Sequence, residues 1–279
     1  MSNQRTHYVT TTDGVTIGGT VDGRGPALVF LQGAVGDGDL DWQRVRGHLA
    51  DRYTCHLPSM RGRGLSGDHP DLSTGRILED FVTYVDSIGE PVGLTGWSGG
   101  GYFTLGVAER RPDAVAAAAP FEPGVLSLMD QTEQAVAGAA AARTAELAAD
   151  GNLVAATRAF LGWPFTEEDL AGAEDAGYVE AAARYVPNVL NLLQQAMQED
   201  EAATIEDPAV LGTISAPMLV LLGTDTKRFF TTCARHVVDH VPGARIQEIP
   251  GAGHAAPLTH PAALAEALTG FFASTLQAA

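Results

Sequence analysis

The sequence contains little cysteine, a minority of basic residues and no long apolar segment. Its 279 residues include only two cysteines, Cys55 and Cys233, which lie far apart and in no spacing typical of a metal or redox site. Lysine and arginine together number 17 against 34 acidic residues, which gives a formal net charge of −17. This balance disfavours nucleic acid and anionic membrane surfaces as partners.

Targeting and membrane-spanning patterns are also missing. Residues 1–9 are polar and lack the basic-then-apolar pattern of a signal peptide. No apolar run approaches the roughly 20 residues that a transmembrane helix requires. We therefore expect a cytoplasmic protein without a membrane partner.

Patterns that bind cofactors are absent as well. The sequence has no glycine-rich phosphate loop and no dinucleotide fingerprint after its first parallel strand. His, Cys and carboxylate residues form no cluster at the spacing of metal ligands. We therefore predict that the protein uses neither a cofactor nor a metal, and that its partner is a small-molecule substrate.

What the sequence does contain is an alternation of apolar strands and amphipathic helices. Around the turn dipeptide Asp13-Gly14, residues 7–21 predict an antiparallel hairpin. A continuous apolar run at residues 27–31 indicates a strand that is covered on both faces. Further strands are indicated at residues 53–57, 92–95, 115–119, 217–222 and 245–249. Helices are indicated after Ser98 and at residues 41–50, 74–88, 229–241 and 261–276. This order predicts an α/β fold with a doubly wound, mostly parallel sheet.

Residues 125–211 interrupt this alternation. The segment is rich in Ala and Glu, and its clearest helical stretches are residues 135–149 and 179–197, with no convincing strand. We interpret it as a helical cap inserted into a core that residues 1–124 and 212–279 form.

A Gly-x-Ser-x-Gly sequence follows the third of the buried strands. Ser98 lies at its centre, flanked by Gly96 and Gly100, and a helix-compatible stretch comes next. In such a strand–turn–helix, the serine has a strained backbone and the glycines allow strand and helix to approach closely. The exposed hydroxyl becomes a nucleophile when a base accepts its proton. His254, in a glycine-containing loop after the last predicted strand, is the candidate base.

Four motifs in this order resemble the α/β-hydrolase superfamily. They are the loops after the first two buried strands, the serine turn and the histidine loop, at residues 32–36, 61–66, 96–100 and 251–254. The resemblance covers most of the chain outside the cap and implies an eight-stranded, mostly parallel sheet. It also implies an oxyanion hole formed by the main-chain N–H groups of Ala34 and Gly99, each worth about 3–4 kcal/mol.

Gln32 stands where the family usually has histidine. Because the group that contributes there is a main-chain N–H, we expect the change to be tolerated. The Gln32 amide either hydrogen-bonds within its loop or faces the pocket and contacts the substrate. Arg61 and Arg63 are expected to brace their loop through backbone carbonyl groups, with binding of a substrate carboxylate as the alternative.

Two tryptophans are candidates for the wall of a substrate pocket. Trp97 lies within the serine turn and is expected to pack on the core while it shapes the site. Trp163 belongs to residues 160–165, the most apolar part of the cap, which either joins cap to core or lines the pocket. An apolar lining suits a medium-sized hydrophobic molecule.

Two carboxylates compete for the role of the acid that orients the histidine. The family usually places this acid after the strand that ends at Leu222, where Asp225 stands one residue before the usual position. In related branches, such as the haloalkane dehalogenases, it follows the strand after the elbow helix, close to Glu122. We favour Glu122 and keep Asp225 as the alternative.

The resemblance implies hydrolysis of a carboxylic ester, lactone or thioester through an acyl-Ser98 intermediate. A serine at the elbow argues against the dehalogenase and epoxide-hydrolase branches, which need a carboxylate nucleophile. Two alternatives use the same fold. One is a cofactor-free oxygenase, carbon–carbon bond hydrolase or polyketide-tailoring enzyme with His254 as base, and the other is a non-catalytic small-molecule receptor.

Overall fold

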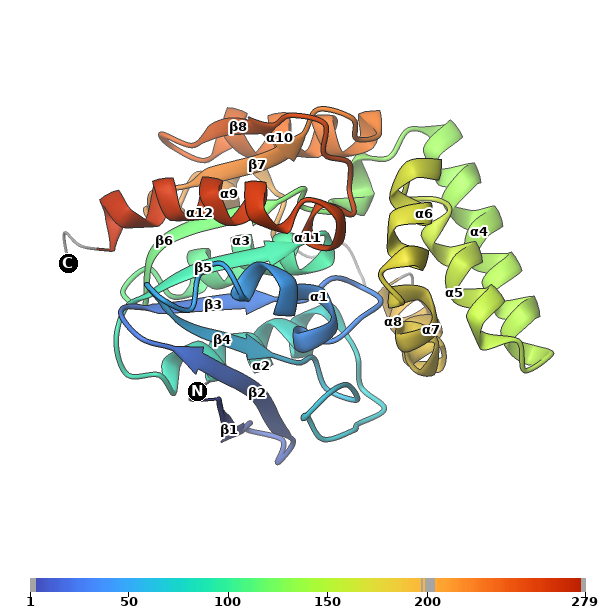
Figure 1. Ribbon diagram of the computed structural model, residues 1–279, viewed down its shortest axis with the longest axis horizontal. Helices are drawn as coiled ribbons and strands as arrows, with labels where there is room; N and C mark the ends of the chain where they lie inside the picture. The colour runs from blue at the N-terminus through green and yellow to red at the C-terminus, as the bar shows by residue number, and fades with distance from the viewer. Residues whose placement is uncertain (1–3, 197, 199–203, 277–279) are drawn as a thin grey trace.

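A computed structural model describes residues 4–196, 198 and 204–276 of the chain. Within these residues, eight strands form one sheet in the order β1-β2-β4-β3-β5-β6-β7-β8 (Figure 1). The strands are β1 (Arg5–Thr10), β2 (Thr16–Gly23), β3 (Ala27–Leu31), β4 (Thr54–Pro58), β5 (Val92–Trp97), β6 (Val115–Phe121), β7 (Leu219–Gly223) and β8 (Arg245–Ile249). The predicted eight-stranded, mostly parallel sheet is confirmed.

β1 and β2 form the predicted antiparallel hairpin at one edge of the sheet. Gly14 in its turn has a φ of 85°, a left-handed conformation that glycine adopts without steric cost. β2 also pairs antiparallel with β4, and every later pair of described strands is parallel. The carboxyl ends of β3 to β8 therefore share one edge of the sheet, where loops can bring distant residues together.

Alternate side chains of the central strands supply a separate hydrophobic core on each face of the sheet. In β3, Leu28 and Phe30 join one core, whereas Val29 and Leu31 join the other. Three helices cover the first core: α1 (Gly38–Arg46), α11 (Ala256–Thr259) and α12 (Pro261–Thr275). Three others cover the second core: α2 (Thr74–Asp86), α3 (Gly99–Arg110) and α10 (Arg228–His240). Because helices cover both faces of the sheet, every residue of β3 is buried, and its sequence is a continuous apolar run.

β6 runs further than the sequence predicts. The predicted strand ends at residue 119, before a proline, whereas β6 continues through Pro120 to Phe121. Proline removes one hydrogen-bond donor, but the pairing resumes at once, because the Phe121 carbonyl accepts the Ser98 N–H at 3.1 Å. This extension carries the next residue, Glu122, to the edge where the other loops meet.

Helices α4–α8 lie between β6 and β7 in the sequence and stand together beyond the carboxyl edge of the sheet (Figure 1). They are α4 (Gln131–Ala149), α5 (Leu153–Leu161), α6 (Glu167–Asp175), α7 (Tyr178–Ala182) and α8 (Val186–Ala196). The stretch predicted at residues 179–197 is two helices, α7 and α8, joined by a 3-10 turn, and residue 197 lies outside the described residues. The short helix α9 (Pro208–Leu211) ends the segment and packs against α3 and α10.

Both cysteines are buried as free thiols, Cys55 in β4 and Cys233 in α10. Burial raises the pKa of each thiol to about 12, so both are un-ionised core residues at neutral pH. The described residues contain no group of three or more His, Cys, Asp or Glu side chains that could hold a metal ion. None of the described helices is both long and apolar enough to cross a membrane.

Candidate active site

Ser98 occupies a sharp turn between β5 and α3. Its φ of 57° lies in the left-handed region that residues other than glycine rarely adopt. The flanking glycines leave no room for side chains: a Cβ on Gly96 would lie 2.1 Å from the carbonyl oxygen of Gly100. A Cβ on Gly100 would lie 2.3 Å from the carbonyl oxygen of Leu31. The predicted strand–turn–helix is therefore present, and it brings Ser98 to the wall of a cavity.

His254 lies in the loop after β8 and is almost fully buried. Its Nδ1 lies 2.6 Å from Oε2 of Glu122. The main-chain N–H groups of His254 and Ala255 donate to the two carboxylate oxygens of Asp169, at 3.1 and 3.0 Å. A Cβ on Gly253 would lie 2.4 Å from that carboxylate, which explains the glycine before the histidine. Asp169 belongs to α6, so a helix of the inserted segment holds the backbone of the histidine loop.

Aromatic rings surround the imidazole of His254. The ring of Phe230 stacks on it, with centroids 3.6 Å apart and planes 14° from parallel. The rings of Trp97 and Phe165 lie 5.8 and 5.9 Å from it, measured between centroids. This packing fixes the plane of the imidazole and limits the access of water to it.

Glu122 follows β6 directly and is fully buried. Its φ of 45° is left-handed, the only other such value among the described non-glycine residues besides that of Ser98. The main-chain N–H of Gly223 donates to Oε1 at 2.8 Å, and the Thr226 hydroxyl donates to Oε2 at 2.9 Å. Together with the contact to His254, these hydrogen bonds hold the carboxylate in one orientation.

Asp225, the alternative acid, lies elsewhere. Its side chain is solvent-exposed, and Oδ1 accepts a hydrogen bond from the Thr224 hydroxyl at 2.9 Å. Of the two candidate carboxylates, the structure brings Glu122 to His254 and pairs Asp225 with Thr224 instead.

The two groups expected to form an oxyanion hole lie side by side. A Cβ on Gly99 would lie 3.8 Å from the main-chain nitrogen of Ala34. In the described part of the chain, neither of these N–H groups donates a hydrogen bond to another protein group. Both residues also line the same cavity as Ser98. Two free N–H donors beside an exposed hydroxyl can bind an oxygen atom that gains negative charge.

Gln32 braces this loop and does not line the cavity. Its side chain is buried, its Nε2 donates to the Gly36 carbonyl at 2.7 Å, and its Oε1 accepts the Met60 N–H at 2.7 Å. Because backbone groups use both ends of the amide, the expectation that Gln32 contacts the substrate is corrected in favour of the local role.

Two buried ionisable residues hold the loop at residues 33–36 from opposite sides. Nη1 of Arg63 donates to the carbonyl groups of Ala34 and Gly36, at 2.7 and 3.0 Å. Asp41 accepts the Gly33 N–H at 2.7 Å. Burial raises the pKa of Asp41 to about 7, against the effect of this hydrogen bond, and burial lowers the pKa of Arg63 to about 10.

The loop is also joined to the inserted helices through Asp41. The hydroxyl of Tyr178, the first residue of α7, donates to the second oxygen of Asp41 at 2.9 Å. A Cβ on Gly36 would lie 1.9 Å from that oxygen, so glycine is needed there for the loop to close over the carboxylate. The position of the expected oxyanion loop therefore depends on a contact with α7.

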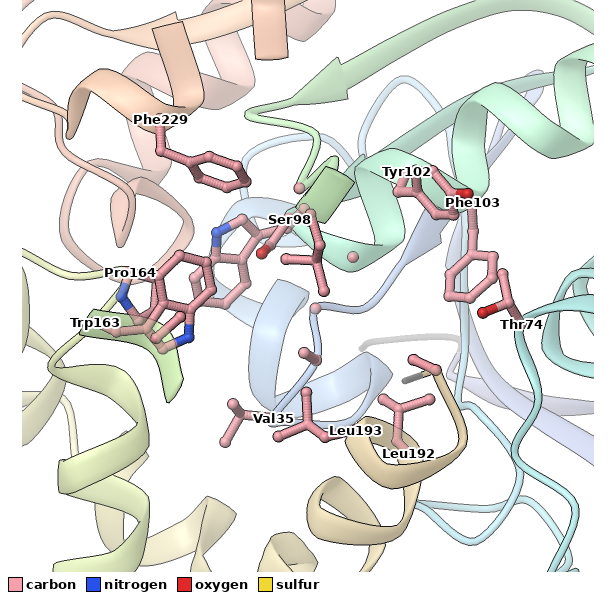
Figure 2. Close-up of a pocket in the computed structure, with 18 of the residues that line it drawn as sticks. Val35, Thr74, Ser98, Tyr102, Phe103, Trp163, Pro164, Leu192, Leu193 and Phe229 are labelled. Atoms are coloured by element: carbon pink, nitrogen blue, oxygen red, sulfur yellow. The ribbon is translucent and has the colours of Figure 1, made fainter. Parts of the chain in front are cut away.

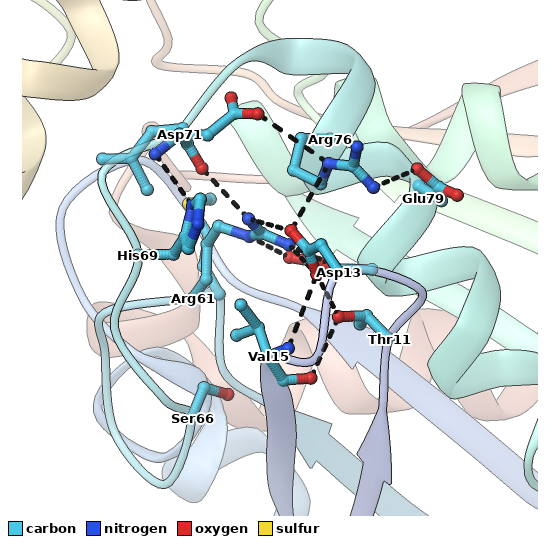
Figure 3. A network of polar contacts seen from close by, with 12 residues as sticks. Thr11, Asp13, Val15, Arg61, Ser66, His69, Asp71, Arg76 and Glu79 are labelled. Carbon is cyan, nitrogen blue, oxygen red and sulfur yellow. Dashed lines mark hydrogen bonds and ion pairs between the residues drawn. The ribbon is translucent and has the colours of Figure 1, made fainter.

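Arg61 belongs to a separate polar network that joins its loop to α2 and to the β1–β2 turn (Figure 3). Its guanidinium pairs with Asp80 of α2 at 2.6 Å and with Asp13 of the β1–β2 turn at 3.0 Å. Hydrogen bonds from Thr11 and Arg61 hold the pKa of Asp13 below its ordinary value. Arg61 does not line the cavity, so it anchors the loop rather than binding a substrate carboxylate.

A cavity of about 620 Å³ separates the sheet edge from the inserted helices. Ser98 and His254 line it together with Trp97, Trp163 and a mostly apolar set of neighbours. In Figure 2, Trp163, Pro164 and Phe229 lie on one side of Ser98, and Tyr102 and Phe103 on the other. Both predicted tryptophans are thus in the cavity wall, and the Trp163 ring also contacts that of Phe229, with centroids 5.6 Å apart.

Three residues that support the site were not found from the sequence: Asp41, Asp169 and Tyr178. The spacing of Thr166 and Asp169 is typical of a helix start, and the two side chains do form a capping box. That pattern gives no sign of the second role of Asp169, which is to bind the histidine loop 85 residues later.

Comparisons with known proteins agree with this architecture. The model of the family described as "Alpha/beta hydrolase family" matches residues 28–267. The chain is 25% identical over 243 residues to a pimeloyl-[acyl-carrier protein] methyl ester esterase of Chromobacterium violaceum, covering 85% of this chain and 91% of that protein. A protein of the same description from Xanthomonas campestris pv. campestris is 28% identical over 263 residues, covering 91% and 98%.

Solved structures show the same fold. An alpha/beta hydrolase from Sphaerobacter thermophilus superposes with a TM-score of 0.74 at 26% identity, covering 95% of this chain and 100% of that one. An esterase from Rhodococcus sp. gives a TM-score of 0.76 at 20% identity, covering 97% and 99%. The second likeness, at its lower identity, concerns the fold alone.

Proposed function

The chain belongs to the alpha/beta hydrolase family, and we propose that it is a serine hydrolase. The proposed reaction is hydrolysis of a carboxylic ester, lactone or thioester of a medium-sized hydrophobic small molecule through an acyl-Ser98 intermediate. The relatives from Chromobacterium violaceum and Xanthomonas campestris are named as esterases, which supports ester hydrolysis at the level of the family.

One observation carries this proposal: a buried His254–Glu122 pair beside the cavity that Ser98 lines. The pair is 2.6 Å apart between Nδ1 and Oε2. An imidazole whose Nδ1–H is bound by a carboxylate presents its other nitrogen as a base. His254 lines the cavity together with Ser98, so that base belongs to the same site as the hydroxyl.

In the proposed first half-reaction, Nε2 of His254 accepts the hydroxyl proton while Oγ of Ser98 bonds to the substrate carbonyl carbon. The carbonyl oxygen gains the negative charge and is bound by the N–H groups of Ala34 and Gly99. When the tetrahedral centre collapses, the bond to the leaving group breaks and His254 donates the proton to it. The Glu122 carboxylate stabilises the imidazolium that forms in between.

In the second half-reaction, water replaces the leaving group. His254 accepts one proton of the water as its oxygen bonds to the acyl carbon. Collapse of the second tetrahedral centre breaks the bond to Ser98 Oγ, which regains the proton, and the carboxylic acid leaves. The balance is one water consumed for each ester cleaved, with no cofactor or metal in any step.

We propose that residues 125–211 act as the cap over this site, with residues 1–124 and 212–279 as the core. Trp163 and the aromatic residues near it supply an apolar wall from the cap side. Such a wall favours hydrophobic groups, because each buried CH₂ contributes about 0.8 kcal/mol. The substrate is accordingly a small molecule with at least one apolar arm.

Turnover of p-nitrophenyl butyrate by the wild type and two variants tests the proposal. We expect both Ser98→Ala and His254→Ala to lower kcat by at least about 10³-fold, because nucleophile and base act as one unit. A Ser98→Ala protein that retains much of its activity, with loss only in His254→Ala, would instead support proton abstraction by His254 on the same fold.

A further inference from the structure

The cavity that Ser98 lines also contains a carboxylate that the proposed reaction does not use. Glu206, between α8 and α9, forms part of the cavity wall and is half-buried. Its Oε2 accepts the Tyr102 hydroxyl at 2.8 Å, and its Oε1 accepts the Ser127 hydroxyl at 2.7 Å. Both carboxylate oxygens are therefore held in place at the cavity wall.

Among the described residues, this carboxylate takes part in no ion pair. Arg110 also lines the cavity, but its side chain is exposed and not paired with Glu206. The residues outside the described ranges, 1–3, 197, 199–203 and 277–279, include no lysine or arginine.

Glu206 carries its charge at neutral pH. Burial acts to raise its pKa, but hydrogen bonds from Ser127, its own main chain and Tyr102 outweigh burial and hold the pKa below the ordinary value. An ionised carboxylate at a cavity wall, with no ion pair among the described residues, attracts a ligand of opposite charge. The site is therefore suited to a cation.

Glu206 is connected to the nucleophile through α3. Tyr102 lies one helical turn after Ser98, and its N–H donates to the Ser98 carbonyl at 3.0 Å. Figure 2 shows Tyr102 on the opposite side of Ser98 from Trp163. An ester held at Ser98 would thus have one arm against the aromatic wall and the other directed along α3 toward Glu206.

We propose, building on the proposed function, that this site prefers esters in which one arm is apolar and the other ends in a protonated nitrogen, with Glu206 as the residue that selects the cation. The ammonium group would form a charge-assisted hydrogen bond with the carboxylate, while the ester carbonyl lies at Ser98. The net charge of −17 adds a long-range attraction for such a molecule.

The test uses two pairs of esters that differ only by a terminal ammonium in place of a methyl group. The first pair varies the acyl arm: the p-nitrophenyl esters of heptanoic acid and of aminohexanoic acid with the amine at its far end. The second varies the alkoxy arm: heptyl butyrate and aminohexyl butyrate. For at least one pair, we expect wild-type kcat/KM to be about tenfold or more higher for the ammonium ester, as for a hydrogen bond to a charged group.

Two matched variants test whether Glu206 causes the preference for the ammonium ester. Glu206→Gln should bring the ratio of kcat/KM, ammonium over methyl, close to one. Glu248→Gln removes the same charge from an exposed position of β8 and should leave the ratio at the wild-type value. A wild-type ratio of one or less in both pairs would overturn the inference, and this result does not depend on whether the Glu206 variant folds. An unchanged ratio in a folded Glu206→Gln protein would also overturn it.

Binding separates this inference from the proposed function. In a Ser98→Ala protein, titration calorimetry with the same esters reports Kd without turnover. Tighter binding of the ammonium ester supports the inference whether or not the wild type hydrolyses esters, and equal Kd values within both pairs contradict it. Absence of turnover on all four esters contradicts the proposed function alone.

Discussion

Among single residues, Glu122 shows how a strained backbone can select one carboxylate over another. Its left-handed φ of 45° directs the side chain toward the end of β7, where Gly223 and Thr226 bind it, and toward His254. A conformation of this kind costs about 1–3 kcal/mol and persists where surrounding contacts hold it. Three hydrogen bonds to one buried carboxylate are such contacts, so the strain at Glu122 is a sign of its role.

Amide substitutions at the two candidate acids distinguish them. Glu122→Gln keeps the size of the side chain but removes the charge that stabilises the imidazolium, so we expect kcat to fall by about 10³–10⁴-fold. Asp225→Asn, at an exposed position, should change kcat less than about twofold. Steady-state rates on p-nitrophenyl butyrate measure both. A larger loss in the Asp225 variant would contradict the assignment of Glu122.

Most residues of the proposed site could be found from the sequence, which favoured Glu122 as the acid but did not exclude Asp225. Ser98 and His254 stand in glycine-containing turns whose spacing after buried strands is visible in one dimension. Glu122 and Asp225 both follow a strand end, and the sequence carries no signal for the φ value that separates them. The role of Gln32 could not be decided from the sequence either, because one of its two hydrogen bonds is with the Met60 N–H, whose position depends on the fold.

At the scale of elements, the loop at residues 33–36 and helix α7 are joined through one buried carboxylate. Asp41 of α1 binds the Gly33 N–H on one side and the Tyr178 hydroxyl on the other. Arg63 holds the same loop through its carbonyl groups. The expected oxyanion donor at Ala34 is therefore oriented by elements from both the core and the inserted segment.

The raised pKa of Asp41 gives this junction a measurable pH dependence. With a pKa of about 7 when folded and about 3.9 when unfolded, the folded state retains a proton between these values that the unfolded state has lost. Its contribution to the free energy of unfolding is therefore greatest below pH 4, falls by about 1.4 kcal/mol per unit as the pH rises to 7, and is constant above that.

Asp41→Asn isolates this contribution, because the amide cannot titrate. Between pH 5 and pH 7, the free energy of unfolding of the wild type should fall relative to that of the variant by about 2–3 kcal/mol. Urea unfolding of both proteins at the two pH values measures it. The same wild-type-to-variant difference at pH 5 and at pH 7 would mean that Asp41 is already ionised throughout that range.

Strands and helices of the core could be predicted because each has a hydrophobic pattern of its own. β3 and β7 are continuous apolar runs, and α2 and α10 have one apolar face. How α6 and α7 pack on the sheet edge could not be predicted in full, since their apolar packing is combined with polar contacts, such as Asp169 with the histidine loop and Tyr178 with Asp41. The sequence around Asp169 and around Tyr178 gives no indication of the distant residues that these side chains bind.

For the whole molecule, the parallel sheet explains why residues far apart in sequence form one site. Ser98, Glu122 and His254 follow β5, β6 and β8, and the carboxyl ends of these strands share an edge. Helices cover both faces of the sheet, and α4–α8 stand beyond that edge (Figure 1). Residues of these helices line the cavity together with Ser98. Substrate selection then depends on the cavity wall, which is aromatic near Trp163 and acidic at Glu206.

The most direct measurement of the central claim is covalent labelling with a fluorophosphonate, followed by peptide mass spectrometry. A serine hydroxyl attacks the phosphorus atom only when a neighbouring base has activated the hydroxyl. Labelling therefore reports an activated serine, and not only an exposed one. We predict one label per chain, located on Ser98, absent from Ser98→Ala and strongly slowed in His254→Ala and Glu122→Gln. An active wild-type protein that takes up no label at Ser98 would contradict the account.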